Sequence, residues 1–163
     1  MSSIKPFIDY TPFETTDFQL IKLDDWYISK DDHLPILDML SNEEEDQLTL
    51  LIALNQYVNV IPYKREAQGR DHWKSPEEFF SDYEGDCEDF CVAKYALLAK
   101  AGLIDPAQDR VIVGMDVDDV AHAVLLHNEY ILDNRTPIVR HMSDVSYFRP
   151  LYGVTPTTIH LYT

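Results

Sequence analysis

The 163-residue sequence has few basic residues, few glycines and no long apolar run. Its 13 lysines and arginines stand against 29 aspartates and glutamates, and the formal net charge of −16 repels phosphate backbones and anionic lipid surfaces. No stretch approaches the run of about 18 apolar residues that a membrane span needs. We therefore expect no nucleic-acid partner and no membrane partner.

The sequence also has only two cysteines, Cys87 and Cys91, which lie four residues apart. This spacing is typical of neither a disulfide framework nor the paired ligands of a structural zinc site. The first residues, Met1 to Pro6, lack the apolar segment of a signal peptide. We therefore expect a cytoplasmic protein without disulfides or structural zinc.

The pattern of apolar residues predicts helices first and strands afterwards. Helical spacing and start signals indicate helices over about residues 42–60, 75–83 and 87–100, the first beginning with a capping box from Ser41 to Glu44. Short segments rich in Val, Ile, Leu and Tyr indicate strands over residues 110–117, 121–127, 130–134 and 157–162. This order predicts an α+β fold with a mostly antiparallel sheet, and the length suits a single domain over residues 1–163.

Residues 1–40 show no sustained helical or alternating period, but they are rich in aromatic side chains. Six aromatic residues within the first 27 are more than a solvated tail usually carries. We therefore expect an N-terminal arm that packs across the domain, with a disordered leader as the alternative.

Cys87 lies at the expected start of the third helix, in Gly85-Asp86-Cys87-Glu88-Asp89. The free amides and partial positive charge of a helix N-terminus stabilise a thiolate, and Gly85 permits a tight turn into the helix. The negative charges of the three neighbouring acids act in the opposite direction and raise the pKa of the thiol. We therefore expect a histidine or a cation beside Cys87. The alternative is a structural, buried cysteine.

His122 and Asp133 lie on strands that we expect to be neighbours. If the turn between them centres between His127 and Asn128, the two residues lie directly opposite each other, with Cβ atoms about 5 Å apart. The carboxylate would then orient the imidazole, whose other ring nitrogen would face Cys87.

The chain resembles the bacterial transglutaminase-like cysteine proteinases, the LapG-type branch of the papain-like transglutaminase fold. The Gly-Asp-Cys-Glu-Asp block followed by Ala-Lys-Tyr is specific to this resemblance. The matching blocks are Val58 to Tyr63, Asp71 to Phe79, Gly85 to Phe90, Ala93 to Tyr95, Ala121 to Leu125, and Leu132 to Asn134.

The resemblance implies a peptidase acting on polypeptides, with Cys87 as the nucleophile, His122 as general base and then acid, and Asp133 as the orienting group. It also implies dependence on calcium, whose ligands by position are Asp86, Glu88 and Asp89. Consecutive acids are equally ordinary at a helix start, so this set has a structural alternative.

The oxyanion of an acyl intermediate needs donors that are fixed before reaction. We expect one from the Cys87 amide and a second from the Asp71-His72-Trp73 segment, although Trp73 also suits a buried core position. The same residues also suit a transglutaminase or deamidase acting on side-chain amides. A non-catalytic calcium- or partner-binding module of the same fold is the alternative from another functional class.

Overall fold

The computed structural model describes residues 5–15, 26–28, 33–65 and 73–162. Its helices are α1 (Leu34–Leu40), α2 (Gln47–Asn59), α3 (Pro76–Asp82) and α4 (Cys87–Lys100), with short 3-10 turns η1 (Phe7–Asp9) and η2 (Met142–Asp144). Its strands are β1 (Pro12–Thr15), β2 (Arg110–Asp116), β3 (Ala121–His127), β4 (Tyr130–Leu132), β5 (Arg140–His141), β6 (Phe148–Val154) and β7 (Ile159–Tyr162). No helix in these described ranges has the length and apolar character needed to cross a bilayer.

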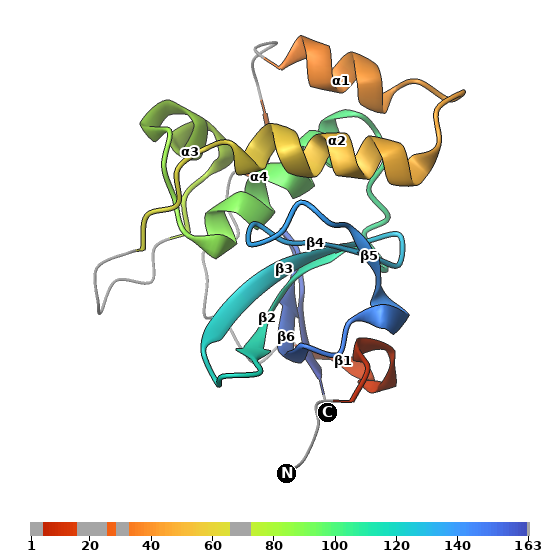
Figure 1. The fold of residues 1–163 in the computed structure, drawn as a ribbon, viewed down its shortest axis with the longest axis vertical. Helices are drawn as coiled ribbons and strands as arrows, with labels where there is room; N and C mark the ends of the chain where they lie inside the picture. Colours follow the sequence, from red (N-terminus) through yellow and green to blue (C-terminus); the bar gives the residue numbers. More distant parts are fainter. Residues whose placement is uncertain (1–4, 16–25, 29–32, 66–72, 163) are drawn as a thin grey trace.

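The strands form one sheet in the order β1-β7-β6-β2-β3-β4-β5, and each neighbouring pair is antiparallel. The α-helices form a layer on one side of this sheet, in which α4 packs against β3 and α2 packs against α4 (Figure 1). The predicted α+β fold with a mostly antiparallel sheet is therefore confirmed.

Alternate residues of the central strands enter two separate apolar cores, one on each face of the sheet. Ala123 and Leu125 pack with the helix layer, whereas Val124 and Leu126 pack on the opposite face. This alternation is the period-two pattern of a strand that is buried on both faces. The sheet is thus fixed from both sides around β3.

The predicted helix starts are confirmed for α3 and α4 but not for α2. Ser75 caps α3 by accepting a hydrogen bond from the Glu78 amide, and α4 begins at Cys87. The Ser41 capping box is wrong, because the Ser41 hydroxyl donates to the Leu37 carbonyl at the end of α1. Asp46 caps α2 instead by accepting from the Thr49 amide. The acidic residues Glu43 to Asp46 therefore lie before the first turn of α2.

The described parts of residues 1–40 pack against the rest of the chain, and they contain a helix, α1, that the sequence did not predict. Phe7 stacks on Phe148 with ring centroids 6.4 Å apart, and β1 pairs with β7. Trp26 contacts the ring of Tyr95 edge-on at a centroid distance of 5.4 Å. The arm thus contributes one aromatic anchor to each core.

The sequence also did not predict β6. Pro150 interrupts its apolar pattern, and a proline normally excludes an interior strand because it has no N–H to donate. The pairing of β2 with β6 shifts register between Val113 and Gly114, and Gly114 faces Pro150 across the irregularity. The bulge accommodates the proline inside the sheet.

Gly85, which we expected to permit a tight turn into α4, lies where the chain packs too closely for a side chain. A Cβ atom at this position would lie 2.7 Å from a ring carbon of Phe79 and 2.9 Å from the Cβ of Asp89. Gly85 is also absent from the described residues with positive φ, where Gly102 at φ 77° is the glycine.

Replacing Gly85 with alanine is expected to lower the free energy of unfolding by about 2 kcal/mol, because overpacked sites force their neighbours apart. Urea denaturation measures this change. Gly102→Ala is the matched control: its Cβ would meet no atom within 4 Å, so only backbone strain of about 1 kcal/mol is expected. Equal losses in the two variants would contradict the packing role of Gly85.

Candidate active site

Cys87 is the first residue of α4, and its partly buried thiol lies against β3. The backbone N–H of Ala123 donates a hydrogen bond to the thiol, which places the sulfur beside the residue that follows His122. β4 pairs with β3 only from Leu125 onward, so Ala123 lies beyond the end of β4. The helix start therefore meets a part of β3 that β4 does not cover.

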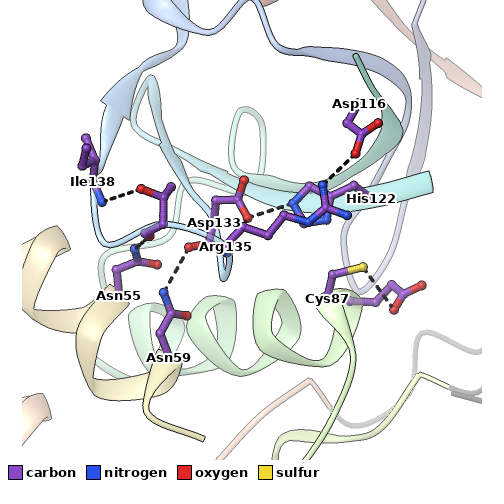
Figure 2. A network of polar contacts seen from close by, with 10 residues as sticks. Asn55, Asn59, Cys87, Asp116, His122, Asp133, Arg135 and Ile138 are labelled. Atoms are coloured by element: carbon purple, nitrogen blue, oxygen red, sulfur yellow. Dashed lines mark hydrogen bonds and ion pairs between the residues drawn. The ribbon is translucent and has the colours of Figure 1, made fainter. Parts of the chain in front are cut away.

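Burial and the neighbouring negative charge both favour the protonated form of the Cys87 thiol. Burial raises the pKa of the thiol most, followed by the negative charge of Glu88, while the Ala123 N–H lowers it. The thiol donates to Glu88 Oε2, with the sulfur 3.7 Å from the oxygen (Figure 2). Ionisation of Cys87 thus requires a proton acceptor or a compensating positive charge.

His122 and Asp133 form a buried pair, with Nε2 of the imidazole 2.8 Å from Oδ1 of the carboxylate. Both are almost completely buried, with His122 at 2% and Asp133 at 3% exposure. Among the described residues, His122 Nδ1 has no hydrogen-bond partner. The carboxylate therefore fixes the ring through one nitrogen and leaves the other for a proton transfer.

The predicted register of this pair is wrong. Leu125 pairs with Leu132 and His127 with Tyr130, so the two-residue turn consists of Asn128 and Glu129. Asp133 is therefore not directly opposite His122. Because the register differs from the prediction by two residues, Asp133 stays on the same face and reaches His122 diagonally. Asn128 and Glu129 both have positive φ, as a type I′ turn requires.

Side chains from α2 hold the backbone that follows β4. Asn59 donates through Nδ2 to the carbonyl of Asp133 at 3.0 Å, and Asn55 donates to the carbonyl of Thr136 at 2.9 Å (Figure 2). The Arg135 amide also donates to Asp133 Oδ1. Asp133 is thus held in place by the end of β4 that precedes it, by the loop that follows it and by α2. The sequence interpretation assigned no role to either asparagine.

The three acids predicted to bind calcium lie at the start of α4, but they differ in their surroundings. Asp89 accepts from the Lys74 amide at 2.8 Å and from the Asp86 amide at 3.1 Å, so it caps the helix. Burial and then the charge of Asp86 raise the pKa of Asp89 to about 7. Within the described chain, no three His, Cys, Asp or Glu side chains converge as a metal site.

Trp73 is partly buried and packs against the core, stacked on Trp26 at a centroid distance of 6.1 Å. Its role at the oxyanion stays a prediction, and the neighbouring Asp71 and His72 lie outside the described residues.

Tyr63 was missed by the sequence interpretation. Its backbone bridges to Gly85, and the pKa of its phenol is raised by burial and then by Cys87. Tyr63 therefore lies on the segment that runs beside the start of α4, with its ring about half exposed.

A second buried histidine–aspartate pair lies at the other end of β3. His127 Nδ1 is 2.8 Å from Asp109 Oδ2, and Asp109 Oδ1 accepts from the Asn128 amide. The sequence analysis assigned no role to His127. This pair ties the β3–β4 turn to the residue before β2, and it provides an internal comparison for the pair beside Cys87.

Comparison with known proteins identifies a family that fits this geometry. A family model described as bacterial transglutaminase-like cysteine proteinase matches residues 35–149. The calcium-bound structure of Legionella pneumophila LapG is 28% identical with a TM-score of 0.68, covering 78% of this chain and 74% of that one. An EGTA-treated LapG structure matches with the same identity and TM-score and is covered over 72% of its chain.

A search of curated proteins finds no match. The helix layer and antiparallel sheet, with their likeness to LapG, are those of the papain-like transglutaminase-type fold that the sequence predicted. The family match extends from α1 into β6 and includes Cys87, His122 and Asp133. The chain therefore belongs to the bacterial transglutaminase-like cysteine proteinases.

Proposed function

We propose that this protein is a cysteine peptidase that hydrolyses an amide bond of a polypeptide through Cys87, His122 and Asp133. The observation that carries the proposal is the fixed His122–Asp133 pair beside a cysteine at a helix start, whose thiol is bound by the next residue of the histidine's own strand. Nucleophile, base and orienting group are the three parts that thiol acyl transfer requires.

The reaction begins when Nδ1 of His122 takes the proton of the Cys87 thiol. The sulfur then bonds to the substrate carbonyl carbon, and the carbonyl oxygen becomes an oxyanion. As the C–N bond breaks, the protonated imidazole gives its proton to the leaving amine, and a thioester remains on Cys87. Water then attacks the thioester carbonyl carbon while His122 takes one of its protons. The C–S bond breaks, the imidazolium returns that proton to the Cys87 sulfur, and the carboxylic acid product is released and ionises in solvent.

The oxyanion forms where α4 begins. The Cys87 amide is one donor, because the first amides of a helix have no partner within the helix. A second donor comes from the segment that contains Trp73. These groups are fixed before reaction by the capping of α4 by Asp89, which also binds the Lys74 amide next to Trp73.

The proposal is tested by incubating the enzyme with a cell lysate and labelling newly formed N-termini for mass spectrometry. Hydrolysis predicts new N-termini that are absent when Cys87 has first been blocked with iodoacetamide. A thioester intermediate predicts a peptide adduct on Cys87 that hydroxylamine releases. Release of ammonia without new N-termini would overturn peptide hydrolysis and indicate a side-chain amide as the substrate.

We further propose that Asp86 and Glu88 bind Ca²⁺. Their carboxylate oxygens are the ligands that calcium prefers, and LapG has a calcium-bound structure. The charge of Asp86 raises the pKa of the neighbouring buried Asp89, so this helix start favours a cation. When bound, the ion supplies positive charge that offsets the effect of the acids on the Cys87 thiol.

Calcium is expected to raise the melting temperature relative to chelator-treated protein by about 6 °C at saturation, because a ligand that binds only the folded state stabilises it. Differential scanning calorimetry measures this shift. Glu88→Gln should remove most of it, whereas Glu84→Gln should keep it, because Glu84 pairs with Lys64 instead. A melting temperature that is the same with calcium and with chelator would rule out binding at this site.

A further inference from the structure

A cavity of about 590 Å³ lies where the α1–α2 loop, the end of α4 and the β3–β4 turn come together. Three exposed acids border it, Glu43, Glu45 and Asp105, and we call them the rim carboxylates. The buried Asp109 is a fourth carboxylate in its lining. The described residues that line the cavity include no lysine or arginine. The cavity therefore attracts positive charge and repels anions.

Part of the cavity wall is apolar. Leu40 of α1 and Leu50 and Leu51 of α2 line it, and all three are buried. An inorganic cation gains nothing from such a surface, and no three His, Cys, Asp or Glu side chains of the described chain converge as a metal site. An alkyl chain that carries a positive charge can pack its methylene groups on the leucines. The lining thus favours an organic cation.

His127 contributes a hydrogen-bonding group to the cavity. It is only 4% exposed, it lines the cavity, and its Nδ1 lies 2.8 Å from Asp109 Oδ2. The amides of Asp105 and Asn128 also donate to the Asp109 carboxylate. Because this carboxylate only accepts, Nδ1 donates to it, and Nε2 of the neutral imidazole carries a lone pair. Within the described ranges, no hydrogen bond reaches Nε2.

The ligand therefore needs an N–H donor as well as a positive charge. An ammonium group has three donors on a compact charge, and one ring nitrogen can accept from one of them. A guanidinium group instead presents a planar fork that matches the two oxygens of a carboxylate. The single acceptor nitrogen of His127 favours the ammonium group.

We propose that this cavity binds a primary alkylammonium group, whose N–H donates to Nε2 of His127 while its alkyl chain packs on the leucines and the rim carboxylates offset its charge. The proposal does not depend on the function of Cys87. His127 is the last residue of β3, whereas His122 lies near its first residue, so the two histidines serve opposite ends of the strand.

The test is long-range ¹H–¹⁵N NMR of the full chain labelled with ¹⁵N-histidine and titrated with cadaverine at about pH 8, where this diamine is still protonated. Nε2 of His127 should be unprotonated in the free protein and should shift saturably with cadaverine, while the ring nitrogens of His122 stay unchanged. Pentanol, which has the same carbon chain without charge, should give no saturable shift. A protonated Nε2 in the free protein, an unmoved His127 or an equal response to pentanol would overturn the proposal.

Glu45→Gln and Glu44→Gln form a matched pair of variants. Both residues are exposed and adjacent in the α1–α2 loop, but of the two Glu45 lines the cavity. Glu45→Gln should weaken cadaverine binding by about threefold in isothermal titration calorimetry, because a solvent-exposed charge pair contributes little free energy. Glu44→Gln should keep the wild-type affinity. Equal affinities of the two variants would contradict the role of the rim carboxylates.

A primary ammonium group can come from a free amine or from a lysine of a polypeptide, and two probes separate these sources. Calorimetry compares cadaverine with the peptide acetyl-Gly-Lys-Gly-amide, and the same peptide with norleucine in place of lysine is its uncharged control. Tighter binding of the lysine peptide supports a polypeptide partner, and tighter binding of cadaverine supports a small amine. If neither probe binds more tightly than its uncharged counterpart, the proposal is wrong.

Discussion

Alanine at Cys87 is expected to abolish peptide hydrolysis, with kcat/KM falling by about 10⁴-fold or more because no other group takes the place of the sulfur. The variant should still fold, since the thiol is only partly buried and its hydrogen bond from Ala123 is a weak one to sulfur. Activity is measured on the peptide bond identified in the lysate experiment, and folding by thermal denaturation.

Cys91→Ala is the matched control for this experiment. Cys91 lies one turn further along α4, is 1% exposed and packs in the core beneath the helices. Burial raises the pKa of its thiol well above the ordinary value, so it is not a nucleophile near neutral pH. This variant should lose stability but keep its activity per folded molecule. Equal activity of Cys87→Ala and wild type would eliminate the proposed nucleophile.

The helices that position the site could be predicted where local signals act alone. Ser75 and Pro76 start α3, and the Gly102 stop ends α4, because these signals depend on the backbone of a few neighbouring residues. The start of α2 was misplaced because Ser41 also suits the end of a helix, and the short helix α1 before it competes for that residue. Local patterns do not decide between two such uses.

The His122–Asp133 contact illustrates a different limit. The sequence indicated a hairpin with His122 and Asp133 on one face, but not the turn that sets its register. Asn128 and Glu129 occupy the positive-φ positions, and a glutamate there is not a usual turn signal. The predicted contact is still found, because a register error of two residues keeps both side chains on the same face of the sheet. An error of one would have separated the pair.

The supports of the site could not be predicted because they join residues far apart in the chain. Asn59 on α2 binds the carbonyl of Asp133, 74 positions away, and nothing in its own helical pattern distinguishes it from a solvated asparagine. The complete burial of Lys94 has no local signal either, because it follows from the packing of α4 on β3. Tertiary packing, rather than local sequence, sets the surroundings of these residues.

Replacing Asp133 with alanine is expected to lower kcat/KM by about 10³-fold, because His122 then lacks the acceptor that holds its ring and tautomer. Asp133→Asn retains an oxygen near the same place and should lie between this variant and wild type. The alanine variant should also lose about 3 kcal/mol of stability, since it leaves buried polar groups without their partner.

Asp109→Ala separates catalysis from stability, because it breaks the second buried pair. In that pair an imidazole nitrogen, Nδ1 of His127, is also 2.8 Å from a carboxylate oxygen. The pKa of each carboxyl is lowered in the folded protein, Asp109 through its His127 hydrogen bond and Asp133 through that of His122, against burial in both cases. Each of these carboxylates stabilises the fold at pH values above its unfolded-state pKa of about 3.9. This contribution disappears as the pH falls through the folded-state pKa.

Melting temperatures at neutral pH should therefore fall in both variants, and their difference from wild type should narrow in acid. Activity per folded molecule should fall only in Asp133→Ala, because only this carboxylate orients a histidine beside Cys87. If Asp109→Ala lost as much activity as Asp133→Ala at equal folded fractions, the His122–Asp133 pair would be a structural tie like the other one, and the proposed catalytic role of Asp133 would be wrong.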